Sequence, residues 1–486
     1  METASKDLTA VHEAEHRREP GKIMQRFWET ARSFEGRCIA WIAACFSLTS
    51  AGYLSWLYHM AGSLSPVRAD VFSMVVGYLF QAAGTGLGMF LLRRKPAAEH
   101  RNLYLLSLIG FFLAAVLSSL VRPLWLILLF GFLMNLGCGI IAAFYLAVPV
   151  QLLDRNRAKV FGIGYGISTL LIGLLSLVAG GKLLATRSAA IVCFLLALAS
   201  AFLGMRVFEQ TEPAEELSET DRGQKRMGPE SLYLVGFTVL LFSLVKNLGF
   251  SFPTEDILNG VSLELSRLFY ATGLIAAGIL SDHNRRYGAI CTFAALAIPF
   301  VMLAVQNEPL PRFLCWGLDY LFFGFFSVFR VVLFMNIARE ERNRTMAPLG
   351  LALGRIGDAA GTAFCIGLAQ YRLVLIGLTL VLFILATFFF FRLFHVIYEP
   401  EKEKERSERE IFEDFAMQHD LSAREKEVLR LLLNERSNAE IAGTLFVSES
   451  TIKYHVHNLL QKTGTKSRQD LIKKYNVMLF PGLGKD

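Results

Sequence analysis

Long apolar runs separated by short polar segments dominate the first 400 residues of the chain. A helix that crosses a membrane needs roughly 20 mostly apolar residues, and the chain holds twelve runs of about this length. These runs are 38–59, 70–92, 103–121, 124–150, 160–180, 188–208, 231–250, 265–280, 287–305, 314–337, 347–369 and 373–398. The pattern therefore predicts twelve transmembrane helices in two blocks of six, 38–208 and 231–398.

The composition supports this interpretation. Of the 486 residues, 53% are apolar and 19% are charged, whereas a soluble globular protein carries about 25% charged residues. The formal net charge of +7 makes the water-facing parts basic, which fits anionic lipid or nucleic acid as neighbours. We expect a basic tail at 1–37 and a polar linker at 209–230, between the two blocks.

Lysine and arginine are distributed unevenly between the loops on the two sides of the predicted membrane domain. If the N-terminus lies inside, the inner loops hold sixteen of these residues and the outer loops hold seven. Short cytoplasmic loops carry the excess of positive charge in membrane proteins. We therefore expect a multi-pass protein of the cell membrane with both termini in the cytoplasm.

The two blocks contain an internal repeat. Residues 154–157 read Asp-Arg-Asn-Arg and residues 341–344 read Glu-Arg-Asn-Arg, an offset of 187 positions. Each segment precedes a glycine-rich run. These runs contain Gly162, Gly164, Gly166 and Gly173 in the first block, and Gly350, Gly354, Gly357 and Gly361 in the second. Small residues let membrane helices approach closely, and two repeated halves are the plan of many transporters.

The loop at 278–288, Gly-Ile-Leu-Ser-Asp-His-Asn-Arg-Arg-Tyr-Gly, resembles a loop motif of the major facilitator superfamily. The corresponding loop of the first block, 88–95, keeps a glycine and a basic cluster but has Leu92 near the place of the motif's aspartate. The resemblance covers about residues 38–398 and implies a bundle around a central cavity. The degraded copy favours a sensor, whereas the intact Asp282 loop favours a working transporter.

We single out five charged residues inside predicted spans as candidates, and these five all belong to the second block. They are Lys246, Asp319, Arg330, Arg355 and Asp358. Charges within spans are functional candidates because burying them is costly. Arg355 and Asp358 share one helix face and can simply pair. Together with Asn135 of the fourth span, the five residues are our candidates for a small-molecule pocket built mainly by the second block. Trp56 and His59 are weaker candidates for the same cavity.

The pattern changes after the twelfth span. Pro400 is expected to end that helix, and 399–417 is expected to be a charged linker whose run of charges at 401–410 forms solvated chain or a short helix. Four short amphipathic helices are predicted within 418–476, followed by a tail at 477–486. Each helix begins after a serine suited to cap it, and these are Ser422, Ser437, Ser448 and Ser467.

The third of these helices has two chemically different sides. Its apolar residues fall at the spacing of a buried stripe, and they are Ile452, Val456, Leu459 and Leu460. Lys453, Tyr454 and His457 lie on the other side, near the helix start. A helix-turn-helix reads bases with the N-terminal part of its second helix. Lys462, Lys466 and Arg468 add positive charge that would suit phosphate.

Four segments of this region resemble the LuxR-type DNA-binding domain. They are 421–429, 437–442, 447–455 and 466–468. The resemblance implies that Lys453, Tyr454 and His457 face bases, that Thr451 and Arg468 face phosphates, and that the partner is double-stranded DNA bound by a homodimer. Glu435 departs from the glycine that the family often has between its first two helices.

Other chemistry is not indicated by the sequence. The seven cysteines lie in apolar runs without the C-x-x-C spacing of zinc or redox sites. Phosphate-loop, metalloprotease and nucleophile-elbow motifs are absent from the sequence. We therefore expect no catalytic residues, no metal and no cofactor, and we expect that the protein is not an enzyme.

These patterns together predict an all-α protein with twelve transmembrane helices and a C-terminal four-helix domain. The favoured function is a membrane-bound one-component transcriptional regulator that senses a small molecule. The alternative is an active secondary transporter carrying a regulatory DNA-binding domain. A third possibility, tethering of DNA without sensing, is less favoured because of the buried charges. The ligand, the operator and the sign of regulation stay open.

Overall fold

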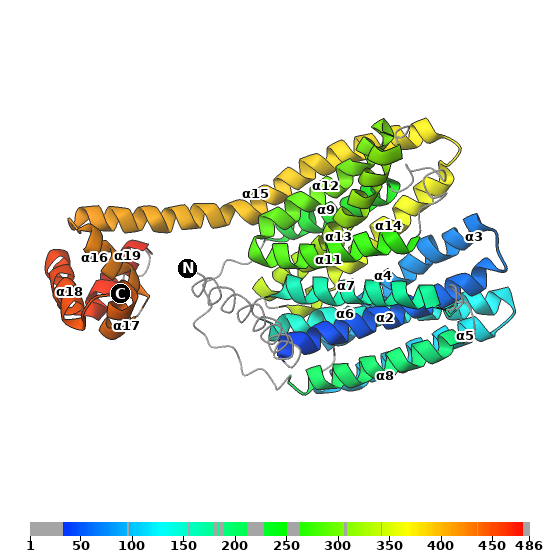
Figure 1. The fold of residues 1–486 in the computed structure, drawn as a ribbon, viewed down its shortest axis with the longest axis horizontal. Coiled ribbons are helices and arrows are strands. Elements are labelled where there is room, and N and C mark those ends of the chain that lie inside the picture. The colour runs from blue at the N-terminus through cyan, green and yellow to red at the C-terminus, as the bar shows by residue number, and fades with distance from the viewer. Residues whose placement is uncertain are drawn as a thin grey trace, which may run out of the picture. The chain divides into compact units, whose positions relative to one another are not determined.

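The computed structural model describes residues 33–479 apart from 95–96, 154–155, 179–182, 185–187, 211–227, 250–262, 306–308, 342 and 435. Within these ranges the regular elements are all helices (Figure 1), so the all-α prediction is confirmed. The chain divides into two compact units, Met1–Phe394 and His395–Asp486.

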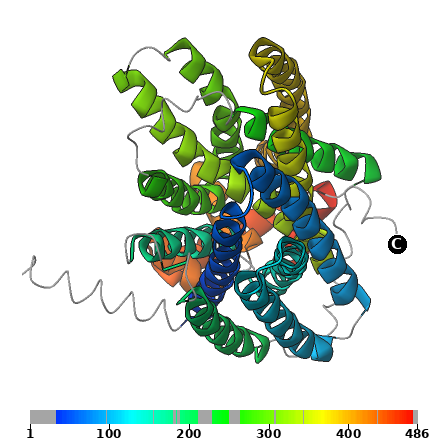
Figure 2. The ribbon, with the colours of Figure 1, turned by 90° about the vertical axis from the view of Figure 1, so that its right-hand side faces the viewer.

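The first unit contains both blocks of six predicted spans. In Figure 1 the blue-to-green helices of the first half run alongside the green-to-yellow helices of the second, and Figure 2 views the same bundle after a quarter turn. The first half comprises α2 (Phe34–Ala61), α3 (Pro66–Asp70), η1 (Val71–Val76), α4 (Gly77–Arg94), α5 (Ala97–Leu120), α6 (Leu124–Leu152), α7 (Arg157–Leu177) and α8 (Ser188–Phe208). The second comprises α9 (Pro229–Gly249), α11 (Leu263–His283), α12 (Arg285–Ala304), α13 (Pro309–Glu340), η4 (Arg344–Met346), α14 (Leu349–Gly367) and α15 (Arg372–Gln418).

Among the described residues, eleven helices are long and apolar enough to cross a membrane. The protein is therefore a multi-pass membrane protein. Helix α11, the eighth predicted span, is not one of the eleven, although it has 21 residues. It packs along both α7 and α13. Because its surroundings are largely protein, it has less need of an apolar surface than a helix that faces lipid.

The two halves contain the same type of close contact between two crossing helices. Gly84 of α4 lies against the backbone of Leu136 in α6, and Gly273 of α11 lies against the backbone of Leu321 in α13. A side chain at either glycine would overlap the facing carbonyl group. Such small-residue contacts let membrane helices approach closely. The same contact in both halves is what the internal repeat in the sequence predicts.

The halves meet where α7 packs along α11. A Cβ atom at Gly162 would lie 2.5 Å from the carbonyl oxygen of Leu274, and one at Gly278 would lie 2.6 Å from that of Ala158. Any larger residue at these two positions would force the halves apart. Gly162 belongs to the glycine-rich run that the sequence analysis singled out, and its role is this contact between the halves.

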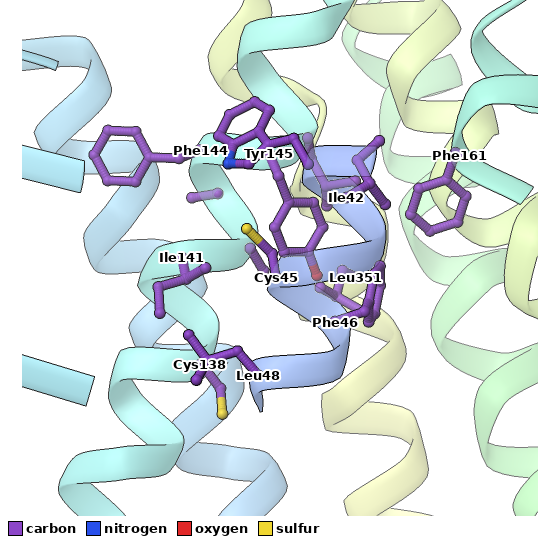
Figure 3. Packing of buried hydrophobic residues seen from close by; sticks show 14 of the residues in the cluster. Ile42, Cys45, Phe46, Leu48, Cys138, Ile141, Phe144, Tyr145, Phe161 and Leu351 are labelled. Atoms are coloured by element: carbon purple, nitrogen blue, oxygen red, sulfur yellow. The ribbon is translucent and has the colours of Figure 1, made fainter. Parts of the chain in front are cut away.

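An apolar core fills the first half and continues into the second. Figure 3 shows its centre, where Ile42 and Phe46 of α2 lie near Tyr145 of α6, and Phe161 and Leu351 belong to the same cluster. The rings of Phe46 and Tyr165 stack with centroids 4.0 Å apart. Buried aromatic contact of this kind holds α2 against the neighbouring helices.

Helix α15 does not end where the sequence predicted. It continues through Pro400 to Gln418, so the segment expected to be a linker is helical. A proline inside a helix removes one backbone hydrogen bond and disturbs the preceding turn. The following residues 401–410 are mostly Glu, Lys and Arg, which are strong helix formers, and this favours continuation on the far side of the proline.

The second unit has its own hydrophobic core. It contains the end of α15 together with α16 (Ala423–Leu433), α17 (Asn438–Leu445), α18 (Glu449–Thr463) and α19 (Arg468–Leu479). Phe412 and Phe415 of α15 enter the core beside residues of all four short helices. Leu429, Ile452 and Leu471 are completely buried there. A separate core of this kind allows a small domain to fold as a unit.

Serine caps begin the short helices as the sequence predicted. Ser422 and Glu425 form a reciprocal capping box at the start of α16, and Ser437 and Glu440 form a second one at the start of α17. The Oγ atom of Ser448 accepts from the backbone N–H of Thr451 in α18. Each cap satisfies N–H groups that have no partner within the helix.

Candidate functional site

Helix α18 presents one buried side and one exposed side. Ile452 and Leu459 are completely buried, and Val456 and Leu460 pack partly against the same core. Lys453, Tyr454 and His457 lie on the exposed side. The predicted stripe is therefore on the inside, and the three residues expected to face bases are all accessible to a partner.

The turn before α18 is tight. Phe446, which ends α17, has a φ of 55°, in the left-handed region that non-glycine residues seldom adopt. Its side chain is 94% exposed. Two residues later Ser448 caps α18. Only Phe446 and Val447 separate α17 from the serine that caps α18, so the connection between the two helices is short.

Lys453 and Lys462 have different environments although they lie on one helix. Lys453 Nζ is 2.9 Å from Glu449 Oε1, and both side chains are at least half exposed. Lys462 Nζ donates to Glu425 Oε2 at 2.7 Å and to the carbonyl oxygen of Asp420 at 2.8 Å, and Glu425 is almost fully buried. Exposed pairs are weak and exchange readily, so Lys453 is free to contact another partner, whereas Lys462 is held within the domain.

Glu425 links this contact to the capping box. Burial acts to raise the pKa of its carboxyl group, but hydrogen bonds from Lys462 and from Ser422 outweigh burial and hold the pKa below its ordinary value. The carboxylate is thus a stable part of the fold. Its partner Lys462, predicted from the sequence to contact DNA, has this internal role in the structure.

The remaining predicted contacts are divided in the same way. Arg468 donates to the carbonyl oxygens of Leu432 and Arg436 and so closes the end of α16. The Thr451 hydroxyl lies 2.8 Å from that of Ser448, at the start of α18. Lys466 is exposed. The structure therefore places Thr451, Lys453, Tyr454 and His457 between the start and the middle of α18, and gives Lys462 and Arg468 partners within the domain.

Lys246 and Asp319 form a buried pair in the membrane unit. Lys246 Nζ is 2.5 Å from Asp319 Oδ1, and both side chains are at most 4% exposed. The Lys246 ammonium also lies 5.8 Å from the centroid of the Phe323 ring, a distance at which a cation is attracted to the ring face. The structure brings these two candidates together, but neither is among the described lining residues of the cavity between the halves.

Arg330, Arg355 and Asp358 form a second cluster. Asp358 Oδ2 accepts from Arg330 Nη1 at 2.9 Å and lies 3.5 Å from Arg355 Nη1. Two guanidinium groups therefore share one carboxylate. The open alternative, pairing of Arg355 with Asp358, is realised only in this shared form.

Asn135 and the two weaker candidates make contacts within the first half. Asn135 accepts from Gln81 Nε2 at 2.7 Å and donates to the carbonyl oxygen of Gly131. Trp56 donates to the carbonyl oxygen of Ile127, and a His59 ring nitrogen lies 2.9 Å from that of Val121. The contacts with Gln81, Ile127 and Val121 connect different segments of the first half, and the contact with Gly131 lies within α6. None of these three candidates lines the cavity.

A cavity of about 270 Å³ lies between the halves. Fifteen of its nineteen lining residues belong to the first half, whereas the charges within the spans had led us to expect a pocket built mainly by the second. Among the six candidates, only Arg355 lines it. Its tyrosines were not predicted, because each lies in an apolar span and looks like a core residue. They are Tyr53, Tyr78, Tyr145, Tyr165 and Tyr270.

Asp282 joins the two halves at one end of the bundle. Its carboxylate oxygens accept from the backbone N–H groups of Ala158 at 3.2 Å and of Lys159 at 2.7 Å. A carboxylate at a helix start satisfies unpaired N–H groups and interacts favourably with the helix dipole. In the first half, Leu92 is instead buried in the apolar core.

Comparisons with known proteins agree with this picture of the C-terminal unit. Residues 419–475 match the family model described as bacterial regulatory proteins, luxR family. Over 52 residues the chain is 42% identical to the spore germination protein GerE of Bacillus subtilis, which covers 70% of that protein and 11% of this chain. Over 83 residues it is 40% identical to the uncharacterized transcriptional regulatory protein YhcZ of the same organism, which covers 33% of that protein and 16% of this chain.

A solved structure is similar to the larger part of the chain. The human organic anion transporter MFSD10 (TETRAN) aligns over 74% of this chain and 97% of its own, with 18% sequence identity and a TM-score of 0.47.

Proposed function

The chain belongs to the luxR family of bacterial regulatory proteins, and on that premise we propose that it is a membrane-bound one-component transcriptional regulator. In this proposal the C-terminal unit binds operator DNA and the membrane unit binds a small molecule. The observation that carries it is the exposed side of α18, with Lys453, Tyr454 and His457, on a chain whose other unit is a membrane bundle with an internal cavity.

The proposed DNA contact uses the start of α18. A helix-turn-helix places the N-terminal part of its second helix in the major groove, and Lys453, Tyr454 and His457 project from that part. A single small module offers few contacts with DNA. We therefore propose that two copies bind together on an inverted repeat.

The test uses residues 408–486, which contain the separate core of the C-terminal unit, fused to a dimerising coiled coil. Selection from random double-stranded DNA should enrich an inverted repeat, and binding should weaken steeply as salt rises. The His457→Ala variant should relax the preference at one base pair. Lys426→Ala is the matched control, because Lys426 lies in α16 and pairs with Glu413. Failure to enrich any sequence would contradict operator binding.

The proposed signal arises in the membrane unit. A ligand shifts an equilibrium only if it binds two states with different affinity, and a cavity lined by both halves would be reshaped if the halves moved against each other. Ligand binding would then change how often two DNA-binding units meet on one operator. A chromosomal reporter measured across a panel of small molecules, with and without the gene, tests this step.

DNA binding requires that the C-terminal unit lie in the cytoplasm. We propose the cell membrane as the location, with both termini inside, as the distribution of Lys and Arg favours. A reporter enzyme active only outside the cytoplasm should be active when fused after Lys182 and inactive when fused after Arg226. Both fusion points lie outside the described residues. The reverse result would contradict the proposed topology.

A second candidate function is active secondary transport by a protein that also carries a regulatory domain. Asp282 favours it, because the contact of its carboxylate with the start of α7 joins the two halves and must break if they separate at that end. Leu92, which makes an apolar contact in the other half, favours sensing. Uptake of labelled solutes that the reporter responds to, measured in vesicles, separates the two functions.

A further inference from the structure

The cavity between the halves has walls of a distinct chemistry. Two arginines, Arg267 of α11 and Arg355 of α14, line it together with five tyrosines. No residue among its described lining is acidic. Positive charge and aromatic surface are therefore both present, and a carboxylate that would neutralise the charge does not contact the space.

Arg355 is only partly compensated by its surroundings. Among the described residues its ion-pair partner is Asp358, at 3.5 Å, and Asp358 also holds Arg330 at the shorter distance of 2.9 Å. The Nε atom of Arg355 is buried and has no hydrogen-bond partner among the described residues. The guanidinium carbon lies 4.5 Å from the centroid of the Tyr78 ring, so the ring fixes the group beside the cavity while its donors stay available.

A second polar atom without a partner lies on the same wall. The hydroxyl group of Tyr53 is buried and has no partner of full hydrogen-bond geometry among the described residues; its neighbour is the hydroxyl of Ser73, which also lacks one. A buried donor without a partner is costly. An anion beside Arg355 is the ligand group that would satisfy a guanidinium, and an acceptor would also satisfy the Tyr53 hydroxyl.

The aromatic part of the wall lies within the same space. Tyr165 stacks on Phe46 with ring centroids 4.0 Å apart and meets the edge of the Tyr270 ring at 5.9 Å. Faces and edges of this kind bind a flat ring by offset stacking or edge-to-face contact. The volume of about 270 Å³ is just below the range of typical ligand pockets, which begins at about 300 Å³, so the space suits one ring better than several.

From these observations we infer that the cavity binds a small aromatic carboxylate, with the carboxylate at Arg355 and the ring among the tyrosines. The inference rests on the proposed function and names the chemical class of its ligand. Because Arg355 belongs to the second half and Tyr53, Tyr78 and Tyr165 belong to the first, such a ligand would connect the halves. It would thereby favour the arrangement in which they lie together.

Other classes of ligand are less complementary to the residues that line the cavity. An amine would be repelled by Arg267 and Arg355 and would find no acidic lining residue among those described. A neutral ring without an acceptor would leave the buried Arg355 Nε and Tyr53 hydroxyl unsatisfied, which is unfavourable. A saturated acid would satisfy the charge but would lose the contacts with aromatic faces.

The experiment measures binding to the purified full-length protein in lipid nanodiscs by titration calorimetry. The probes are benzoate, phenylacetate and 3-phenylpropionate, their neutral amides, benzylamine and cyclohexanecarboxylate. At least one aromatic acid should bind ten times or more tightly than its amide, more tightly than cyclohexanecarboxylate, and without competition from benzylamine. If no aromatic acid binds more tightly than its own amide, the inference is overturned.

Variants locate the binding within the chain. Arg355→Met should abolish binding of the acid and Arg355→Lys should retain part of it, whereas Arg206→Met, at an exposed arginine of α8, should bind as the parent does. Tyr53→Phe should weaken binding several-fold, and Tyr58→Phe, on the same helix but exposed, should not. Thermal unfolding of each variant identifies any that fail to fold. Unchanged affinity in a folded Arg355→Met protein would also overturn the inference.

The same titrations separate this inference from the proposed function. Binding of aromatic acids with no effect on the reporter would support the ligand class and contradict regulation by that ligand. A reporter response that follows the amides or the amine instead would support sensing and overturn the ligand class. Loss of both the acid titration and the reporter response in Arg355→Met, with both retained in Arg206→Met, supports the two together.

Discussion

Two groups of buried charges in the second membrane half are compensated to different degrees. Lys246 and Asp319 match one cation with one anion at 2.5 Å, away from the cavity. Arg330 and Arg355 share the single carboxylate of Asp358, and Arg355 lines the cavity. The difference indicates two uses of buried charge. A matched pair holds helices α9 and α13 together, whereas surplus charge beside open space is available to a ligand.

The C-terminal unit shows a similar difference between two lysines of one helix. Lys462 is tied to the buried Glu425, while Lys453 is paired only with the exposed Glu449. An exposed pair contributes about 0–1 kcal/mol, so a phosphate or a base can replace Glu449 as the partner of Lys453 at little cost. In both units, the charged group with the weaker internal partner is the one we expect to bind another molecule.

The largest effect is expected from breaking the matched pair. Lys246→Met leaves the Asp319 carboxylate buried without its partner, which costs about 3–5 kcal/mol. The purified protein should therefore unfold at a much lower temperature in detergent. The double variant Lys246→Met with Asp319→Leu should recover most of this loss, because an apolar pair of similar volume replaces two buried ions.

The reporter response provides the second measurement on these variants. The double variant should keep the ligand dose-dependence of the parent, since neither residue lines the cavity. A well-folded double variant that no longer responds would show that the matched pair takes part in sensing. The proposed difference between a structural Lys246–Asp319 pair and a ligand-binding Arg355 would then be wrong.

An intermediate effect is expected when the two lysines of α18 are compared. Lys453→Ala should cost about 1–3 kcal/mol of DNA-binding free energy at one base pair and leave the unfolding of the C-terminal unit unchanged. Lys462→Met should destabilise that unit by about 1.5–3 kcal/mol, the range for hydrogen bonds to charged groups. Binding of selected operator DNA and urea unfolding of residues 408–486 measure the two quantities. Equal effects of both changes on DNA affinity would contradict the assignment of Lys453 to DNA contact and of Lys462 to a contact within the domain.

The smallest effect is expected from pH. The pKa of Glu425 is held below its ordinary value of 4.5, so its contribution to folding is complete above pH 4.5 and is lost as the pH falls through the lower folded value. Burial and the nearby Lys474 lower the pKa of His419 below 6.5, so the unfolded chain takes up this proton first and stability also falls as the pH drops below 6.5.

Urea unfolding of residues 408–486 between pH 8 and pH 3 checks both steps. We expect a slight loss that begins below pH 6.5 and a steeper one below pH 4.5, because several carboxylates then protonate. Glu425→Gln should be less stable than the parent at pH 7 and should flatten the steeper step. Stability that rises toward low pH would contradict the assignment of these groups.

The sequence alone predicted the positions of the helices better than the contacts between residues distant in the sequence. Helix positions followed from apolar runs, and the caps at Ser422 and Ser437 followed from a serine just before each predicted helix, because these signals are local. Pro400 led to a wrong prediction of where the helix ends. A proline disturbs only the turn in which it lies, and the strong helix formers after it allow the helix to continue. The closure of Lys462 onto Glu425 spans 37 positions, and nothing in the local pattern distinguishes it from an exposed lysine.

The cavity was harder to predict than the buried charges. Lys246 and Arg355 are equally conspicuous in an apolar span, and only the crossing of helices decides which one meets an opposite charge. The tyrosines gave a signal that was overlooked, because a phenol carries a polar group that needs a partner when buried. Tyr53, Tyr78 and Tyr165 come from three helices, and their convergence depends on the close packing that glycines allow.

The π-helical segment η1, Val71–Val76, lies directly before α4, whose second residue is Tyr78. A π-helical turn accommodates one residue more than an α-helical turn, and one residue corresponds to about 100° of rotation around the helix axis. The extra residue in the preceding π-helical turn therefore sets the direction of the face of α4 that carries Tyr78, Gln81 and Thr85, which line the cavity. Deleting Met74 should convert the segment to regular α-helix and turn this face away from the cavity, so the register of one helical turn sets which side chains a ligand meets.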